Sequence, residues 1–240
     1  MQYDNPAERL LSILTDGKSI SGDQSCKRVW EGLLNVPKNE GALLVSRIGK
    51  AMSLPQEIID RTRELYPNRS PTWLHWSNQV NAAFSTQNIN GQWQTFIQHI
   101  DNHTITYLQM STDLLESKSS IKPLDLDEII QISEKVNDLL VDVISSPEIE
   151  ASIKKYIVHH LRKILISIDE YKITGALPIL DAVETTIGHA YLDEGYRNLL
   201  KNSEIGARIL DTLSATANLV TVAVGIPQIA QTFLQLGGGN

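Results

Sequence analysis

Apolar residues recur at three- and four-residue spacing along most of this sequence, and this spacing limits the fold more than any other feature. In the clearest case, a stripe of leucine, isoleucine and valine runs from Leu126 to Ile144. Such spacing places the apolar side chains on one face of an α-helix. Half-buried strands would instead need apolar and polar residues to alternate, and no segment sustains that pattern. The sequence therefore predicts an all-α protein.

Helix start and stop signals divide the predicted helices into two blocks and a C-terminal segment. We expect an irregular helical domain over residues 1–118, ending at a polar stretch. Residues 123–200 follow as an antiparallel helical-hairpin bundle, because the connection at Ser146-Pro147 is too short for a parallel return. A hydrophobic helical segment then covers residues 204–240.

A few residues decide where two of the helices in the first block begin and end. Pro55 is expected to separate a helix that ends near Met52 from another that begins at Ser53. The reason is that proline suits the first turn of a helix and disrupts its interior. From Trp93 to Leu115, the apolar spacing predicts one long helix.

The composition is that of an ordinary folded protein. Of the 240 residues, 42% are hydrophobic and 20% are charged, which excludes a wholly disordered, fibrous or polytopic membrane protein. The net charge of −7 does not favour binding to nucleic acid. The single cysteine, Cys26, excludes an internal disulfide and a thiolate zinc cluster within one chain. Because the first residues also lack a signal-peptide pattern, we expect a cytosolic protein.

The charges are distributed unevenly along the chain. Residues 70–100 and 212–240 contain no Asp, Glu, Lys or Arg, whereas residues 122–204 supply −6 of the net charge. The first charge-free window holds three of the four tryptophans beside nine Asn or Gln residues. Such a set can form a ligand surface, or it can pack two helices together, because tryptophan buries a large area. The interaction candidates of this window are Trp73, Trp76 and Trp93.

The second charge-free window is the C-terminal segment, residues 212–240. A membrane span needs about 20 predominantly apolar residues, and Asn218 and Pro227 interrupt this segment. Three alternatives stay open: a buried helix pair, an interface with a protein partner or a second copy, and association with a membrane. The segment lacks the Lys and Arg that membrane-surface helices use. Its interaction candidates are Val220, Val222, Val224, Ile226, Phe233 and Leu234.

Two histidines, His99 and His103, are four residues apart on the predicted long helix, so their side chains share a face. Such a pair can bind a metal ion, but no HExxH or ExxH motif supplies a further ligand. Roles at a helix end or on a helix surface are the alternative. The sequence also contains no P-loop, GxGxxG or GxSxG motif. We therefore expect neither a metal nor a cofactor.

The doublet His159-His160 lies on a predicted helix, and the position of His160 turns its side chain toward the apolar stripe. Burial of an imidazole without a partner lowers its pKa, because burial disfavours the charged form. We expect a histidine at a packed interface, with a pH sensor as the alternative.

Arg69 and His75 form an Arg-x5-His arrangement. This spacing resembles the Arg-x4-6-His signature of HEPN-type ribonucleases, which are helical bundles. The resemblance implies that Arg69 and His75 would be catalytic and would cleave RNA at a dimer interface. Pro71 lies between them, so Arg69 is expected in a loop and not on the helix of His75. RNA cleavage is therefore the alternative function.

Four further stretches carry a second resemblance: residues 5–11, 54–58, 91–101 and 157–175. Together they resemble a loose group of uncharacterised bacterial helical proteins, some of them from phage-defence or toxin-type loci. The resemblance brings no catalytic residues. The predicted function is a non-enzymatic helical interaction module, which would serve as a bacterial defence effector or accessory subunit. It would act through protein contacts, self-association or membrane association of its C-terminal segment.

Overall fold

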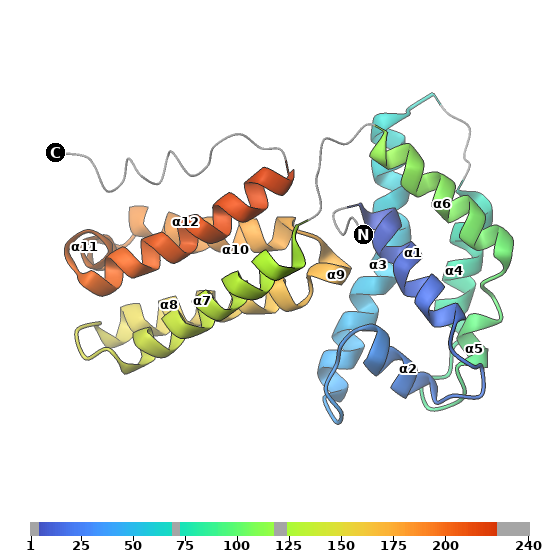
Figure 1. Cartoon of the computed structure of the whole chain (residues 1–240), viewed down its shortest axis with the longest axis horizontal. Coiled ribbons are helices and arrows are strands. Elements are labelled where there is room, and N and C mark those ends of the chain that lie inside the picture. The colour runs from blue at the N-terminus through green and yellow to red at the C-terminus, as the bar shows by residue number, and fades with distance from the viewer. Residues whose placement is uncertain (1–4, 69–72, 118–123, 225–240) are drawn as a thin grey trace. The chain divides into compact units, whose positions relative to one another are not determined.

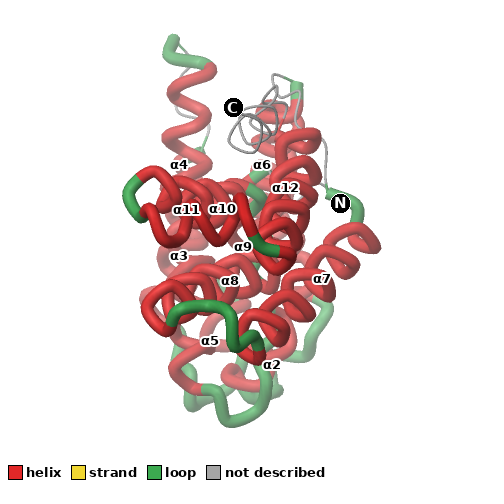
Figure 2. Tube along the Cα trace, turned by 90° about the vertical axis from the view of Figure 1, so that its left-hand side faces the viewer, coloured by secondary structure: helices red, strands yellow, loops and turns green. Residues whose placement is uncertain are grey.

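A computed structural model describes residues 5–68, 73–117 and 124–224, with side chains through residue 221 (Figure 1). Within these residues the regular elements are helices, and one isolated bridge joins Ser25 to Gln92. Figure 2 shows no strand in the same part of the chain. The prediction of an all-α protein is therefore confirmed. Of the helices described, none combines the length and the apolar character needed to cross a membrane.

The chain divides into two compact units, which comprise residues 1–120 and 121–240. The boundary predicted between residues 118 and 123 lies in a segment outside the described residues. The described part of unit 1 contains α1 (Pro6–Lys18), α2 (Cys26–Leu33), α3 (Gly41–Leu65), α4 (Leu74–Thr86), α5 (Gln94–Ile97) and α6 (Asn102–Glu116). Helix α1 packs against α3 and α6, and α4 also packs against α6.

Helix α3 continues through Pro55 to Leu65, so the helix break predicted near Ser53 is wrong. Proline inside a helix removes one backbone hydrogen bond and costs roughly 3 kcal/mol. Packing offsets this cost here, because Pro55 and its neighbours Leu54 and Ile58 are all buried in unit 1. The burial of this face therefore outweighs the local preference of the proline.

The single long helix predicted from Trp93 to Leu115 is also wrong, because α5 ends at Ile97 and α6 begins only at Asn102. Asp101 lies between them in an extended conformation and caps α6. Its carboxylate accepts a hydrogen bond from the backbone N–H of Thr104 at 2.6 Å. An aspartate that satisfies a free amide in this way favours a new helix start over continuation of the old one.

Aromatic side chains of the first charge-free window form the core of unit 1. Trp76 and Trp93 are 0% and 1% exposed. The Trp93 ring lies 4.8 Å from the ring of Phe96 and 5.2 Å from that of Trp30, measured between centroids. Its indole N–H donates to the carbonyl oxygen of Gly17 at 2.9 Å. These contacts join α1, α2 and α5 in one core.

The described part of unit 2 contains α7 (Leu126–Ser145), α8 (Ala151–Asp169), α9 (Tyr171–Thr174), α10 (Leu177–Gly188), the 3-10 helix η1 (His189–Tyr191), α11 (Glu194–Asn202) and α12 (Glu204–Val224). Helices α7 and α8 pack side by side, as Figure 1 shows. Helix α10 packs against α8 and α12, and α12 also contacts α7 and α11.

Helix α12 contains the first part of the second charge-free window. One face of this helix is buried in unit 2 and includes Ile209, Leu213, Ala217 and Val220, each 0% exposed. Residues 212–221 therefore belong to a helix with one face buried. Residues 225–240, to which the predictions of an interface or a membrane segment also refer, lie outside the described residues.

Candidate functional sites

An exposed cluster of polar and aromatic side chains lies where α4 meets the start of α6 in unit 1. The Nε2 atom of His75 is 3.4 Å from each carboxylate oxygen of Asp101. The rings of His103 and Tyr107 lie 6.3 Å and 5.5 Å from the ring of His75. These four residues are the His75 cluster.

Asp101 is held as a carboxylate within this cluster. Its pKa is lowered to about 2, mainly because the backbone N–H of Thr104 donates to it, with a smaller contribution from His75. A carboxylate fixed beside an imidazole orients the ring. His75 therefore has the partner that a general acid or base needs.

The candidate metal-binding pair of the sequence, His99 and His103, does not share a helix face. His99 lies in the segment between α5 and α6, and its Nε2 atom is 2.8 Å from the hydroxyl of Thr86. His103 lies on α6 and belongs to the His75 cluster. In the part of the chain that the structure describes, no group of three or more His, Cys, Asp or Glu side chains could hold a metal ion.

Of the Arg-x5-His pair, the structure describes only His75, because Arg69 lies outside the described residues. The partner that the structure gives to His75 is Asp101, to which the sequence assigned no role. The signal that could have identified it is the sequence Asp101-Asn102-His103-Thr104, in which an aspartate precedes a helix start. The acid–base cluster therefore contains one residue of the predicted pair, His75, and its carboxylate partner Asp101 was not predicted.

The residues predicted as an interaction surface are core residues wherever their side chains are described. Trp73, Trp76 and Trp93 are buried in unit 1, and Val220 is buried in unit 2. Their burial is what the packing alternative describes. The side chains of the other candidates lie outside the described residues: Val222, Val224, Ile226, Phe233 and Leu234.

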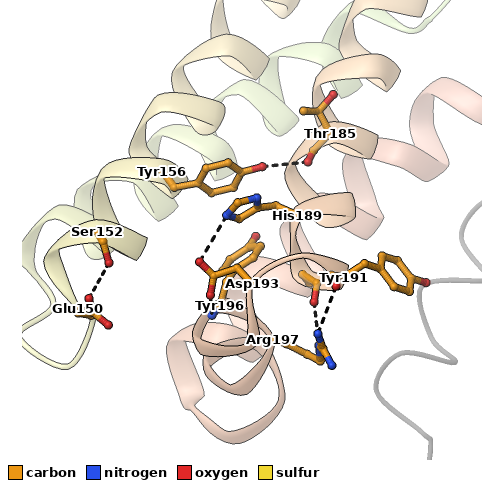
Figure 3. Close-up of polar contacts among 10 residues, drawn as sticks. Glu150, Ser152, Tyr156, Thr185, His189, Tyr191, Asp193, Tyr196 and Arg197 are labelled. Carbon is orange, nitrogen blue, oxygen red and sulfur yellow. Dashed lines mark hydrogen bonds and ion pairs between the residues drawn. The ribbon is translucent and has the colours of Figure 1, made fainter.

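A second cluster of aromatic and imidazole side chains joins α8, α10, η1 and α11 in unit 2 (Figure 3). The Tyr156 ring stacks on His189 with 3.7 Å between centroids, and its hydroxyl donates to the carbonyl oxygen of Thr185 at 3.0 Å. The Nε2 atom of His189 lies 3.6 Å from the carboxylate of Asp193. Asp193 also caps α11 by accepting from the backbone N–H of Tyr196 at 2.9 Å. These residues are the Tyr156 cluster.

His160 lies against the Tyr156 cluster, with its ring 4.2 Å from that of Tyr156, and is buried as the sequence predicts. Burial, Lys163 and two neighbouring histidines lower its pKa to about 4, and burial raises the pKa of Tyr156 to about 12. Neither side chain changes its protonation state near neutral pH. The Nδ1 atom of His160 and the hydroxyl of Tyr196 are buried and have no hydrogen-bond partner among the described residues.

Helix α7 carries apolar side chains on two faces. Its buried face contains Ile129, Ile132, Val136, Leu139 and Val143. Four further large apolar side chains are between 48% and 56% exposed: Leu126, Ile130, Val141 and Ile144. At 100° per residue these four lie within an arc of about 60°, with Asn137 inside it. The four residues and Asn137 form the outer stripe of α7. The sequence spacing does not separate the two faces, because both follow helical periodicity.

Comparison with protein-family models, curated proteins and solved structures gave no match to this chain. Among the three clusters described, the rings of the Tyr156 cluster are buried or half-buried. The His75 cluster and the outer stripe are largely exposed. These two are the surfaces that a ligand or partner can reach.

Proposed function

We propose that this chain is a non-enzymatic helical interaction module that binds another polypeptide through the outer stripe of α7. The supporting observation is that four large apolar side chains on one face of this helix are about half exposed. Soluble proteins rarely leave a contiguous apolar patch uncovered unless it serves as a binding surface. The contact surface is thus α7, and not the tryptophans, which are buried in the core of unit 1.

The shape of the outer stripe favours a helical partner. Residues 126–144 span about 27 Å at 1.5 Å per residue, a length that an amphipathic helix can cover. Complete burial of a leucine or isoleucine side chain stabilises by roughly 1.5–3 kcal/mol, so covering each half-exposed side chain contributes about 1 kcal/mol. The amide of Asn137 needs a polar partner once it is covered. The partner is therefore an amphipathic helix with a polar group at that level.

A photo-reactive amino acid at Ile130 or Ile144 tests this proposal in the intact chain. In cells that produce the protein, irradiation is expected to link both positions to another polypeptide chain. The matched control position is Lys135, an exposed residue on the opposite side of α7, where no adduct is expected. The proposal is wrong if positions 130 and 144 give no adduct, if they link only within one chain, or if position 135 gives the same adducts.

RNA cleavage is a second candidate function, and the His75 cluster is the observation that favours it. His75 is exposed, is paired with Asp101 and has the imidazole of His103 beside it. Metal-free RNA cleavage needs one group that removes the proton of a ribose 2′-hydroxyl and another that protonates the leaving 5′-oxygen. His75 and His103 would fill these roles, and Arg69, outside the described residues, would bind the phosphate.

Cleavage assays with purified chain separate this candidate from the first. Single-stranded RNA is expected to be cut, and the same sequence with 2′-deoxyribose is expected to stay intact. His75→Ala and His103→Ala should each slow cleavage by about 10²-fold or more. His99→Ala is the control and should leave the rate unchanged, because His99 lies outside the cluster. A wild-type rate no higher than that of His75→Ala would exclude the candidate.

A further inference from the structure

We infer that the polypeptide bound by the outer stripe is a second copy of this chain, with the two α7 helices parallel and related by a two-fold axis that runs along them. This inference rests on the proposed function and names its partner. Three features of unit 2 support it. They are the seven-residue spacing within the stripe, the position of α8 beside it, and the charges along its two edges.

The outer stripe has the seven-residue repeat of a two-stranded coiled coil. Two exposed isoleucines, Ile130 and Ile144, lie seven residues on either side of Asn137. The residues four positions before these three are Leu126, Ser133 and Leu140. Isoleucine at the first of these positions and leucine at the second favour two parallel strands, and one asparagine at the first position fixes the register. In a parallel pair, Asn137 meets Asn137, and each amide can donate to and accept from the other.

Helix α8 lies along one edge of the outer stripe. Helix α7 packs mainly against α8 and α12. The ion pair between Asp142 and Arg208 locates α12 on the Asp142 side of α7, about 140° around the helix from Asn137. The buried face of α7 therefore has α12 at one side and α8 at the other, and the side of α8 adjoins the stripe. Half-buried Ser133 and Leu140 lie there, between the stripe and the buried face.

Acids follow the other edge of the stripe, away from α8. At 100° per residue, the exposed side chains of Asp127, Glu134 and Asp138 lie about 50–90° from the centre of the stripe, toward Asp142. Asp142 itself pairs with Arg208 inside unit 2. The edge of α7 away from α8 is therefore acidic.

Bases follow the edge of the stripe that α8 provides. The ammonium group of Lys154 donates to the carbonyl oxygen of Ile144 at 3.2 Å, so the start of α8 lies against the end of α7. Exposed Lys155 and Arg162 lie about 80–100° farther around α8, away from its buried face. Arg162 is also about 10 Å farther along α8 than Lys155, which brings it close to the level of Asn137.

A two-fold axis along α7 brings these opposite edges together. Such an axis keeps the same ends of the two helices at the same level and exchanges the two sides of the stripe. The acidic edge of each copy therefore faces the basic edge of the other, and every contact occurs twice. Arg162 of one copy then lies near the level of Glu134 and Asp138 of the other. An antiparallel pair would instead keep both acidic edges on one side, where they repel.

The contact between two such surfaces is small. Stable protein interfaces bury about 1,200–2,000 Å² in total, and helices about 27 Å long provide only part of that area. We therefore expect a dimer that dissociates on dilution. Salt should weaken it further, because the charges on both edges are exposed to solvent and are screened.

Sedimentation equilibrium of the full chain tests the inference. The wild type is expected to approach a mass of twice 26.7 kDa as its concentration rises. Ile130→Glu should stay monomeric over the same range, whereas Lys135→Glu, on the opposite side of α7, should still form dimers. Circular dichroism establishes that each variant is folded.

Charge reversal tests the contact between the two edges. Asp138→Arg and Arg162→Asp should each raise the dissociation constant of the dimer about tenfold or more, because each places like charges together twice. An equimolar mixture of the two variants should form dimers again, since each of these contacts in a mixed dimer joins opposite charges. A mixture that stays as dissociated as its components would contradict the facing of the two edges.

Cysteine cross-linking in a Cys26→Ser background establishes the direction of the pair. Ile130→Cys and Ile144→Cys chains should each give self-linked dimers on mild oxidation, and Lys135→Cys should give none. A mixture of Ile130→Cys and Ile144→Cys chains should still form self-linked disulfides in preference to mixed ones. A preference for mixed disulfides would show an antiparallel pair and would overturn the inference.

The failure of this inference can be told apart from the failure of the proposed function. A wild type that is monomeric at every concentration, or a dimer that Ile130→Glu leaves unchanged, overturns the inference. If the monomeric chain still gives photo-adducts with a different protein at positions 130 and 144, the proposed function stands and only the partner is wrong. A monomeric chain without such adducts contradicts both.

Discussion

His160 makes the stability of unit 2 depend on pH in mildly acid solution. Burial and neighbouring positive groups lower its pKa from 6.5 to about 4 in the folded chain. Between these values the unfolded chain binds a proton that the folded chain does not. The free energy of unfolding therefore falls as the pH drops from about 6.5 to about 4, by up to about 1.4 kcal/mol per pH unit. Below about pH 4 this contribution is constant.

Urea denaturation across this range measures the effect. The variant His160→Leu removes the titrating group, so its stability should change less between pH 6.5 and pH 4 than that of the wild type. His159→Leu changes an exposed neighbour and should keep most of the wild-type slope. Equal slopes for His160→Leu and the wild type would contradict the burial of a neutral imidazole.

Gly206 is a second position where one residue controls packing. A Cβ atom at this position would lie 2.0 Å from the carbonyl oxygen of Leu199, which is a backbone atom and cannot turn away. Gly206→Ala should therefore destabilise the protein by about 1–3 kcal/mol or more, because α11 and α12 must separate. Gly49 of α3 faces open space, so Gly49→Ala should stabilise by roughly 0.5–1 kcal/mol. If thermal unfolding shows Gly206→Ala to be as stable as Gly49→Ala or more stable, the packing of α11 against α12 described here is contradicted.

At the scale of elements, the start of α6 depends on Asp101. Its carboxylate accepts a hydrogen bond from the backbone N–H of Thr104 and also contacts the ring of His75. Asp101→Ala should cost about 1 kcal/mol of stability, the usual effect of losing a helix cap. Asp101→Asn is the matched control, because asparagine caps a helix about as well as aspartate. Chemical denaturation should therefore place Asp101→Asn near the wild type, and equal losses for both variants would show that the charge matters more than the cap.

Local signals predicted helix positions well where neighbouring residues decide them. The apolar stripe from Leu126 to Ile144 agrees with α7, because its periodicity is regular and its ends carry caps. Prediction failed at Pro55 and at Asp101 for two different reasons. At Pro55, burial in the core outweighed a local penalty, which the sequence does not reveal. At Asp101, one side-chain hydrogen bond outweighed a continuous apolar spacing.

At the scale of the whole molecule, the described tryptophans and phenylalanines of the first charge-free window and one face of the second belong to the core. Trp76 and Trp93 are buried in unit 1, and Leu213 and Val220 are buried in unit 2. The sequence allowed both a core and a ligand surface, because each excludes charges and favours large apolar side chains. The exposed outer stripe of α7 lies outside both windows, among charged residues. Absence of charge therefore marked part of the core, and the candidate interaction surface required the structure.

The unfolding of the two units can be followed with different probes, because all four tryptophans belong to unit 1. Leu213 is fully buried in α12 of unit 2, so Leu213→Ala should cost about 2–5 kcal/mol. The loss should shift unfolding followed by circular dichroism and leave unfolding followed by tryptophan fluorescence unchanged. Leu108→Ala, at an equally buried site of unit 1, should shift the fluorescence transition. If Leu213→Ala shifts both transitions equally, the two units unfold as one cooperative structure.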